Sequence, residues 1–115
     1  MKNSNEFMLL FRFEPNFSYQ PTAEELTQMH QAWGGYIGGL AISEKLVSTY
    51  QLGFEGLKIA TDKSVSAGIL VAENQTLGGN MIVKAADLNE AAEIAKDCPI
   101  LLMGGNVEIR SINPM

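Results

Sequence analysis

Two residue types that often carry chemistry are nearly missing from this chain of 115 residues, which has one cysteine and one histidine. A single cysteine cannot close an internal disulfide, and one cysteine with one histidine cannot complete a structural zinc site. Basic side chains are also few, because 8 lysines and arginines stand against 13 acidic residues and the net charge is −5. Nucleic-acid-binding domains carry clustered basic surface, so this composition argues against direct binding of nucleic acid.

Long apolar runs are missing as well. No stretch approaches the ~20 residues that a membrane helix needs. The run at residues 7–13 is broken by Arg12 and is too short for the core of a signal peptide. Together with the unpaired Cys98, these features predict a cytoplasmic protein that binds no membrane. The chain also lacks the GxGxxG, GxxxxGK[ST], GxSxG, HExxH and CxxC patterns, so we expect no metal and no cofactor.

What remains is an ordinary globular composition, with 46% hydrophobic and 18% charged residues. Domains most often have roughly 100–150 residues, so we expect a single domain over residues 1–115. A chain of this length can bury enough surface for one core without disulfides or metals.

Residues 7–13 are rich in aromatic residues and predict a first strand that ends before Pro15. Because side chains alternate along a strand, they divide into two faces, with Phe7, Leu9, Phe11 and Phe13 on one and Met8, Leu10 and Arg12 on the other. Both faces are mainly apolar. Helices in a small α+β protein cover one face of a single sheet, so the second face needs another sheet or another subunit. The pattern therefore predicts a homodimer.

A long helix is expected from Thr22 to about Leu46. Thr22 is a good cap, and Glu25 stands where it completes a capping box. The stripe expected to face the sheet is Leu26, Met29, His30, Trp33, Ile37 and Leu40. Four glycines interrupt the helix, at 34, 35, 38 and 39, and indicate either close approach by another backbone or a kink.

The rest of the chain predicts short strands and a second helix. Residues 57–61 and 67–72 are candidate strands around a turn at 62–64, residues 74–79 read as a loop, and 81–85 and 107–112 as further strands. Asp87 opens the second helix, and Pro99 marks its end. The resulting β-α-β-β-α-β order predicts a ferredoxin-like α+β fold, in which two helices cover one face of an antiparallel sheet.

Several segments resemble the YCII-related family, whose best-known branch is named DGPF after its motif. The strongest is LGGNMIVKAADLNEA at residues 77–91, which is similar to the family's LGG, strand and AADLDEA succession. Shorter matches are FMLL at 7–10, AWG at 32–34, CP at 98–99 and GNVEIR at 105–110. The resemblance implies a dimeric α+β barrel, in which the sheets of two subunits pack face to face. Some members of the family are joined or linked to sigma-factor-like transcription proteins, so the resemblance implies a regulatory link to transcription, and a histidine–aspartate pair is proposed as catalytic in the YCII branch.

The family's Asp-Gly-Pro-Phe motif would fall at residues 67–70, which read Ala-Gly-Ile-Leu. Only the glycine is kept, and the segment reads as an apolar strand. The resemblance therefore leaves this chain without the motif's carboxylate. Asp62 and Glu73 are the nearby acids able to replace it.

Three residues are candidates for a site. His30 has a side chain suited to proton transfer and is a candidate general base between helix and sheet, but without an identifiable carboxylate partner we favour a histidine at the edge of the core. Arg12 either binds an anionic ligand or forms a salt bridge with an acid such as Glu108 or Glu55, and we favour the salt bridge. Trp33 either lines a ligand pocket or packs in the core, which is the more common role.

Two functions follow from these candidates. The first is a homodimer without catalytic activity that binds a small apolar or weakly anionic molecule, or a protein partner, with a regulatory link to transcription. The second is an enzyme that transfers a proton on a small cyclic or aromatic substrate with His30 as base. We favour the first because the motif aspartate is missing.

Overall fold

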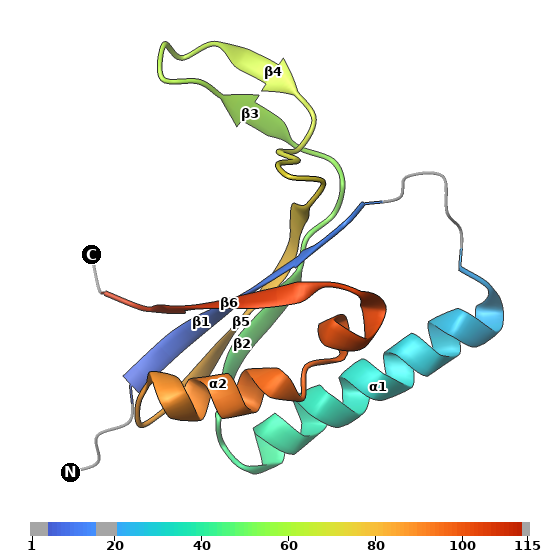
Figure 1. Ribbon diagram of the computed structural model, residues 1–115, viewed down its shortest axis with the longest axis vertical. Coiled ribbons are helices and arrows are strands. Elements are labelled where there is room, and N and C mark those ends of the chain that lie inside the picture. Colours follow the sequence, from blue (N-terminus) through green and yellow to red (C-terminus); the bar gives the residue numbers. More distant parts are fainter. Residues whose placement is uncertain (1–4, 16–20, 114–115) are drawn as a thin grey trace.

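The computed structural model describes residues 5–15 and 21–113. In chain order its elements are β1 (Asn5–Phe13), α1 (Ala23–Ile42), β2 (Leu46–Gln51), β3 (Leu57–Ile59), β4 (Val65–Ala67), β5 (Thr76–Ala85), α2 (Leu88–Lys96), the 3₁₀ turn η1 (Pro99–Met103) and β6 (Asn106–Ser111). A four-stranded antiparallel sheet has the order β2-β5-β1-β6, and both helices lie against one face of it (Figure 1). This is the predicted ferredoxin-like α+β arrangement.

The core lies between the sheet and the helices, and β1 confirms the predicted division into two faces. Phe7, Leu9 and Phe11 are at most 5% exposed, whereas Met8 and Leu10 are only partly buried. The pairing register places Leu9 opposite both Met81 of β5 and Ile109 of β6, which continues the apolar layer across three strands. The buried hydrophobic residues are Phe7, Leu9, Phe11, Met81, Val83, Ala85, Ala91, Ile94, Ala95, Cys98 and Ile100.

Helix α1 starts as predicted and ends earlier. The Glu25 amide donates to Thr22 Oγ1 over 3.1 Å, and the Thr22 amide donates to Glu25 Oε1 over 2.9 Å, so the capping box is formed. The predicted end near residue 46 is wrong, because the helix stops at Ile42. Glu44 takes a left-handed φ of 61°, which ends the helix and lets Leu46 begin β2.

The stripe that α1 turns toward the sheet is also narrower than predicted. Trp33, Ile37 and Leu40 pack against the core as expected, and Tyr36 joins them, but His30 and Leu26 are exposed. The N-terminal turns of α1 extend past η1 and the sheet in Figure 1, which agrees with the exposure of Leu26 and His30. The expected position of His30 between helix and sheet is therefore corrected.

The four glycines of α1 do not serve close packing within the chain. Outside the backbone of α1 itself, no atom of the described residues lies within 4 Å of the Cβ that a larger residue would have at Gly34, Gly35, Gly38 or Gly39. The helix nevertheless continues through all four. Its link to α2 comes instead from Tyr36, whose hydroxyl donates to the Ile94 carbonyl over 2.8 Å.

Helix α2 follows the predicted pattern. Asp87 caps it by accepting from the Glu90 amide over 2.9 Å. Ala91, Ile94 and Ala95 are buried, and the helix ends at Lys96, shortly before Pro99 begins η1. The last strand, β6, lies close to its predicted position.

Residues 52–75, which we call the arm, leave the sheet between β2 and β5. Strands β3 and β4 pair only with each other, around the predicted turn in which the Ser64 amide donates to Asp62 Oδ1 over 2.9 Å. The arm projects away from the rest of the molecule (Figure 1). The radius of gyration is accordingly 15.9 Å, compared with about 13 Å for a compact domain of this length.

The strand predicted at 67–72 is wrong, because β4 ends at Ala67 and Gly68 has a φ of +96°. An L side chain rarely adopts that conformation, so Gly68 stands where the backbone favours glycine. The predicted loop at 74–79 is also partly wrong, since Thr76 already belongs to β5.

A β-bulge interrupts the pairing of β1 with β5. Phe11 lies opposite Gly79 but Arg12 lies opposite Leu77, so Gly78 is an extra residue in β5. A Cβ at Gly78 would collide with the ring of Phe13, which explains why the bulge holds a glycine. The bulge brings Leu77 onto the same face of the sheet as Arg12.

Candidate functional site

The face of the sheet opposite the helices, which we call the open face, carries no helix from residues 5–15 or 21–113 (Figure 1). Its centre is apolar, because Met8 of β1 lies opposite Ile82 of β5 and Leu10 is the next β1 residue on that face. Polar and charged residues surround this centre. The open face comprises Glu6, Met8, Leu10 and Arg12 of β1, Ser48 and Tyr50 of β2, Leu77, Asn80, Ile82 and Lys84 of β5, and Asn106, Glu108 and Arg110 of β6.

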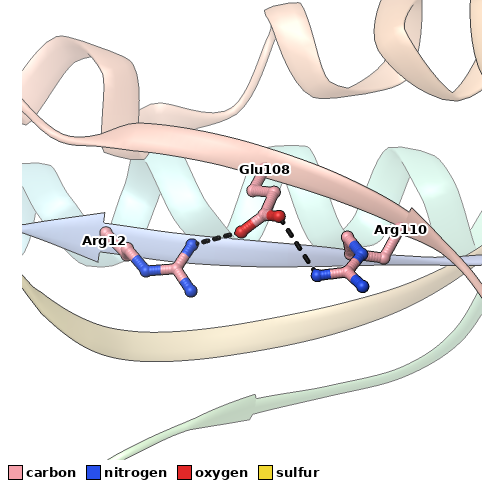
Figure 2. Close-up of polar contacts among 3 residues, drawn as sticks. All are labelled: Arg12, Glu108 and Arg110. Carbon is pink, nitrogen blue, oxygen red and sulfur yellow. Dashed lines mark hydrogen bonds and ion pairs between the residues drawn. The ribbon is translucent and has the colours of Figure 1, made fainter.

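Three charged residues form a chain on the open face, as Figure 2 shows. Arg12 Nη1 donates to Glu108 Oε1 over 2.6 Å, and Arg110 Nη1 donates to Glu108 Oε2 over 3.3 Å. The hydrogen bond from Arg12 lowers the pKa of Glu108, and the positive charges of both arginines act in the same direction. The salt bridge that we favoured for Arg12 is thereby confirmed, and one carboxylate is shared by two guanidinium groups.

A cleft of about 590 Å³ lies beside Arg12 at the root of the arm. Its apolar wall comes mainly from the arm, and its charged residues are two cations and two carboxylates. The residues that line it are Arg12, Leu52, Gly53, Glu55, Leu57, Lys58, Ile69, Leu70, Ala72, Glu73, Gln75, Thr76 and Leu77. A guanidinium has five N–H donors, and among the described residues only Glu108 is close enough to accept one in an ion pair with Arg12. The cleft therefore combines apolar wall with charged groups of both signs.

The structure separates His30 from this cleft. The imidazole is exposed on α1 and has no hydrogen bond or ion pair with any residue in the described part of the chain. It lines neither this cleft nor a second one between the helices. Its catalytic role stays a prediction, since a general base is normally oriented by a hydrogen-bonded partner.

Trp33 lies in the helix layer. Its ring is 5.5 Å from the ring of Phe11 and 6.2 Å from that of Tyr36, measured between centroids. These tilted and edge-to-face contacts are typical of aromatic residues packed in a core. Trp33 also lines neither cleft, so its role as a ligand contact stays a prediction.

The two acids that we named as replacements for the motif aspartate lie in different places. Asp62 is at the tip of the arm, where the hydrogen bonds from Ser64 lower its pKa. Glu73 lines the cleft together with Glu55. Glu73 is therefore the one of the two that stands beside Arg12's cleft, on a left-handed turn with a φ of 52°.

The second cleft, of about 390 Å³, lies between α1 and α2, and two of its three carboxylates have structural partners. Glu90 accepts from the Ala86 amide, and Glu93 pairs with Lys96. The neighbouring Cys98 is 1% exposed, and burial raises its pKa to about 11, so its thiol stays protonated near neutral pH.

Sequence reasoning located Arg12 but missed most of the cleft around it. The arm contributes Leu52, Leu57 and Lys58, and nothing in their spacing indicates that they meet the end of β1. Within residues 5–15 and 21–113 no group of three histidine, cysteine or acidic residues is placed to hold a metal ion. The helices in this part of the chain are too short or too polar to cross a membrane.

Comparison with known protein families finds a match. A family model described as the YCII-related domain matches residues 6–115, which is nearly the whole chain. The search of curated proteins finds no match.

Proposed function

We propose, from the premise that the chain belongs to the YCII-related domain family, that it acts as a homodimer that binds a small molecule. The two open faces pack together, and the ligand occupies the cleft beside Arg12. The observation that carries this proposal is the position of Arg12, which lies on the open face and also lines the cleft. A partner seated on that face therefore also borders the ligand.

The apolar centre of the open face supports the dimer. Met8, Leu10 and Ile82 are apolar side chains on a face that no helix covers. Packing this face against its equivalent in a second copy removes these side chains from water, as in sheet-on-sheet packing. In such a dimer the same surface of each copy faces its equivalent in the other. The surface is self-complementary, because the ion-paired residues Arg12, Glu108 and Arg110 present both signs of charge.

The lining of the cleft supports the class of ligand. Leu52, Leu57 and Leu70 offer apolar wall, and the guanidinium of Arg12 offers donors for a weakly anionic group. Action in the cytoplasm and a regulatory link to transcription through a protein partner remain part of the proposal. The enzymatic alternative with His30 as base has no geometric support, because that side chain is exposed and lacks a partner among the described residues.

Sedimentation equilibrium tests the dimer. We expect a dimer at micromolar concentration, and we expect Leu10→Lys to weaken it because it places a charge at the apolar centre of the interface. Leu102→Lys is the matched control, since Leu102 is 86% exposed in η1, in the helix layer. A native chain that sediments as a monomer overturns the dimer.

Nuclear magnetic resonance tests the cleft, with benzoate as an anionic probe and benzyl alcohol as its uncharged counterpart. Benzoate is expected to shift the resonances of Arg12 and Leu77, and Arg12→Met is expected to weaken benzoate binding about tenfold while leaving benzyl alcohol binding unchanged. If neither probe shifts residues of the cleft, the proposed ligand site is wrong.

A further inference from the structure

The arm has one apolar side and one polar side. Cross-strand pairing places Leu57 opposite Ala67 and Ile59 opposite Val65, so these four residues share one face of the hairpin. Lys58 and Ser66 pair on the other face. The face formed by Leu57, Ile59, Val65 and Ala67, which we call the arm face, follows the same division that separates core and solvent in an ordinary sheet.

Nothing in the described part of the chain covers the arm face. Leu57 is 70% exposed, Ile59 is 72% exposed and Val65 is 60% exposed. Strands β3 and β4 have three residues each, and the arm stands clear of the helices and the sheet (Figure 1). An isolated two-stranded hairpin is at best marginally stable in water, and it gains stability when its apolar face packs against something else.

The charges of the arm favour another copy of this chain over a strongly charged partner. Residues 52–75 contain the acids Glu55, Asp62 and Glu73 and the bases Lys58 and Lys63, so the arm carries only −1 of the chain's net charge of −5. The arm face itself is uncharged. A nearly neutral apolar surface is compatible with a copy of the same chain, which a strongly acidic arm would repel.

The exposed area also fits a second copy. Among the large apolar side chains of the arm, five that lie on or next to the hairpin are 43–72% exposed, namely Leu57, Ile59, Val65, Leu70 and Val71. At roughly 100 Å² of apolar surface for each, the arms of two copies offer about 1,000 Å², which is the area that a specific interface needs. Closed two-fold symmetry would bury both arms at once.

The arm is continuous with the open face, and this continuity decides where the second copy lies. Leu57 of the arm face and Arg12 of the open face line the same cleft. We propose that a second copy seated on the open face also covers the arm face, so that the two copies together close the cleft beside Arg12. The ligand site is then incomplete in one chain alone. This inference rests on the proposed homodimer and adds the arm face as a second part of the dimer interface.

A double substitution on the arm face tests this inference. Ile59→Lys with Val65→Glu places opposite charges directly across the hairpin, which keeps β3 and β4 paired but makes the arm face polar. Ser66→Glu is the matched control, because it places a carboxylate opposite Lys58 on the other face. We expect the double variant to raise the dimer dissociation constant at least about tenfold by sedimentation equilibrium, and Ser66→Glu to change it less than about threefold.

Thiol labelling gives a second readout that does not depend on the double variant. Ile59→Cys is expected to react with a maleimide quickly at low protein concentration and at least about tenfold more slowly once the dimer forms, whereas Ser66→Cys stays reactive throughout. The native Cys98 is 1% exposed and contributes little to the signal. Labelling is done with a non-thiol reductant present, so that no intermolecular disulfide forms.

The outcomes separate this inference from the proposed dimer. If Leu10→Lys breaks the dimer while the double variant dimerises like the native chain and Ile59→Cys is never protected, the arm inference is wrong and the open-face dimer stands. If the double variant breaks the dimer and Leu10→Lys does not, the open-face interface is wrong and the arm contact stands. A native chain that is monomeric overturns both.

Discussion

The hydrogen bond between the two helices leads to a prediction that can be tested by measuring the free energy of unfolding at two pH values. The Tyr36 hydroxyl on α1 donates to the Ile94 carbonyl of α2 over 2.8 Å, in a half-buried position. Tyr36→Phe keeps the ring that packs against Trp33, 6.2 Å away between centroids, and removes only the hydroxyl. The Ile94 carbonyl then loses the hydrogen bond that it accepts from Tyr36. We expect Tyr36→Phe to lower the free energy of unfolding by about 1 kcal/mol near neutral pH.

Alkaline pH is expected to shrink this difference. Burial raises the pKa of Tyr36 above its ordinary value of 10.0, and the charges of Cys98 and Asp97 act in the same direction. Below pH 10 the tyrosine is protonated in both states, so its full contribution is present. Above pH 10 the unfolded chain ionises while the folded chain does not, so stability falls as pH rises. Because the hydroxyl is only partly buried, we expect a loss of about 1 kcal/mol by about pH 11.

Urea unfolding followed by the fluorescence of Trp33 measures both effects at one fixed protein concentration. The native chain and Tyr36→Phe are compared at about pH 7 and about pH 11, so that ionisation of the other tyrosines and the lysines cancels in the difference. The expected result is a gap of about 1 kcal/mol that nearly closes at the higher pH. Equal stability at pH 7, or an equal alkaline loss in the two proteins, refutes the reasoning.

Three further substitutions and one labelling reaction test other parts of the fold. Gly79→Ala brings a Cβ within 2.7 Å of the Tyr50 carbonyl oxygen and is expected to lower the free energy of unfolding by about 2 kcal/mol. Gly34→Ala meets no such atom within 4 Å and is expected to raise the free energy of unfolding by about 1 kcal/mol, because alanine favours the helix. The melting temperatures of the two variants should therefore move in opposite directions. Leu9→Ala empties a site that is 0% exposed and is expected to cost about 3 kcal/mol in urea unfolding. Cys98, whose pKa burial raises to about 11, is expected to alkylate at about pH 8 at least roughly a hundredfold more slowly in the folded chain than in urea, and equal rates would contradict its burial.

Local signals account for what the sequence predicted well. The capping box of Thr22 and the cap at Asp87 depend on residues three positions apart, and both are formed as expected. The alternation in β1 needs no information beyond the strand period, so the division between Phe7, Leu9 and Phe11 and their neighbours is confirmed. The salt bridge of Arg12 was predicted correctly, because a half-buried guanidinium needs an acidic partner and Glu108 was one of the two acids named.

The predictions that were wrong concern features that depend on tertiary contacts. The end of α1 depends on a left-handed residue, Glu44, that has no strong preference for that conformation. The start of β5 at Thr76 is set by pairing with β1 across the bulge, which no local pattern indicates. His30 is exposed because α1 extends beyond the sheet, and helix periodicity does not tell how far a sheet reaches. The cleft was missed for the same reason, since the arm and Arg12 are far apart in sequence.

The bulge at Gly78 divides β5 into two segments whose side chains alternate in different registers. On one side of it, Met81, Val83 and Ala85 follow an alternation fixed by the core. On the other side, Thr76 and Leu77 follow an alternation displaced by one residue, and both line the cleft. The bulge therefore takes up the one-residue offset between the segment that follows the arm and the segment that follows the core. The pairing of Met81 with Leu9 and of Val83 with Phe7 is regular beyond it, so the register of the core does not carry this offset.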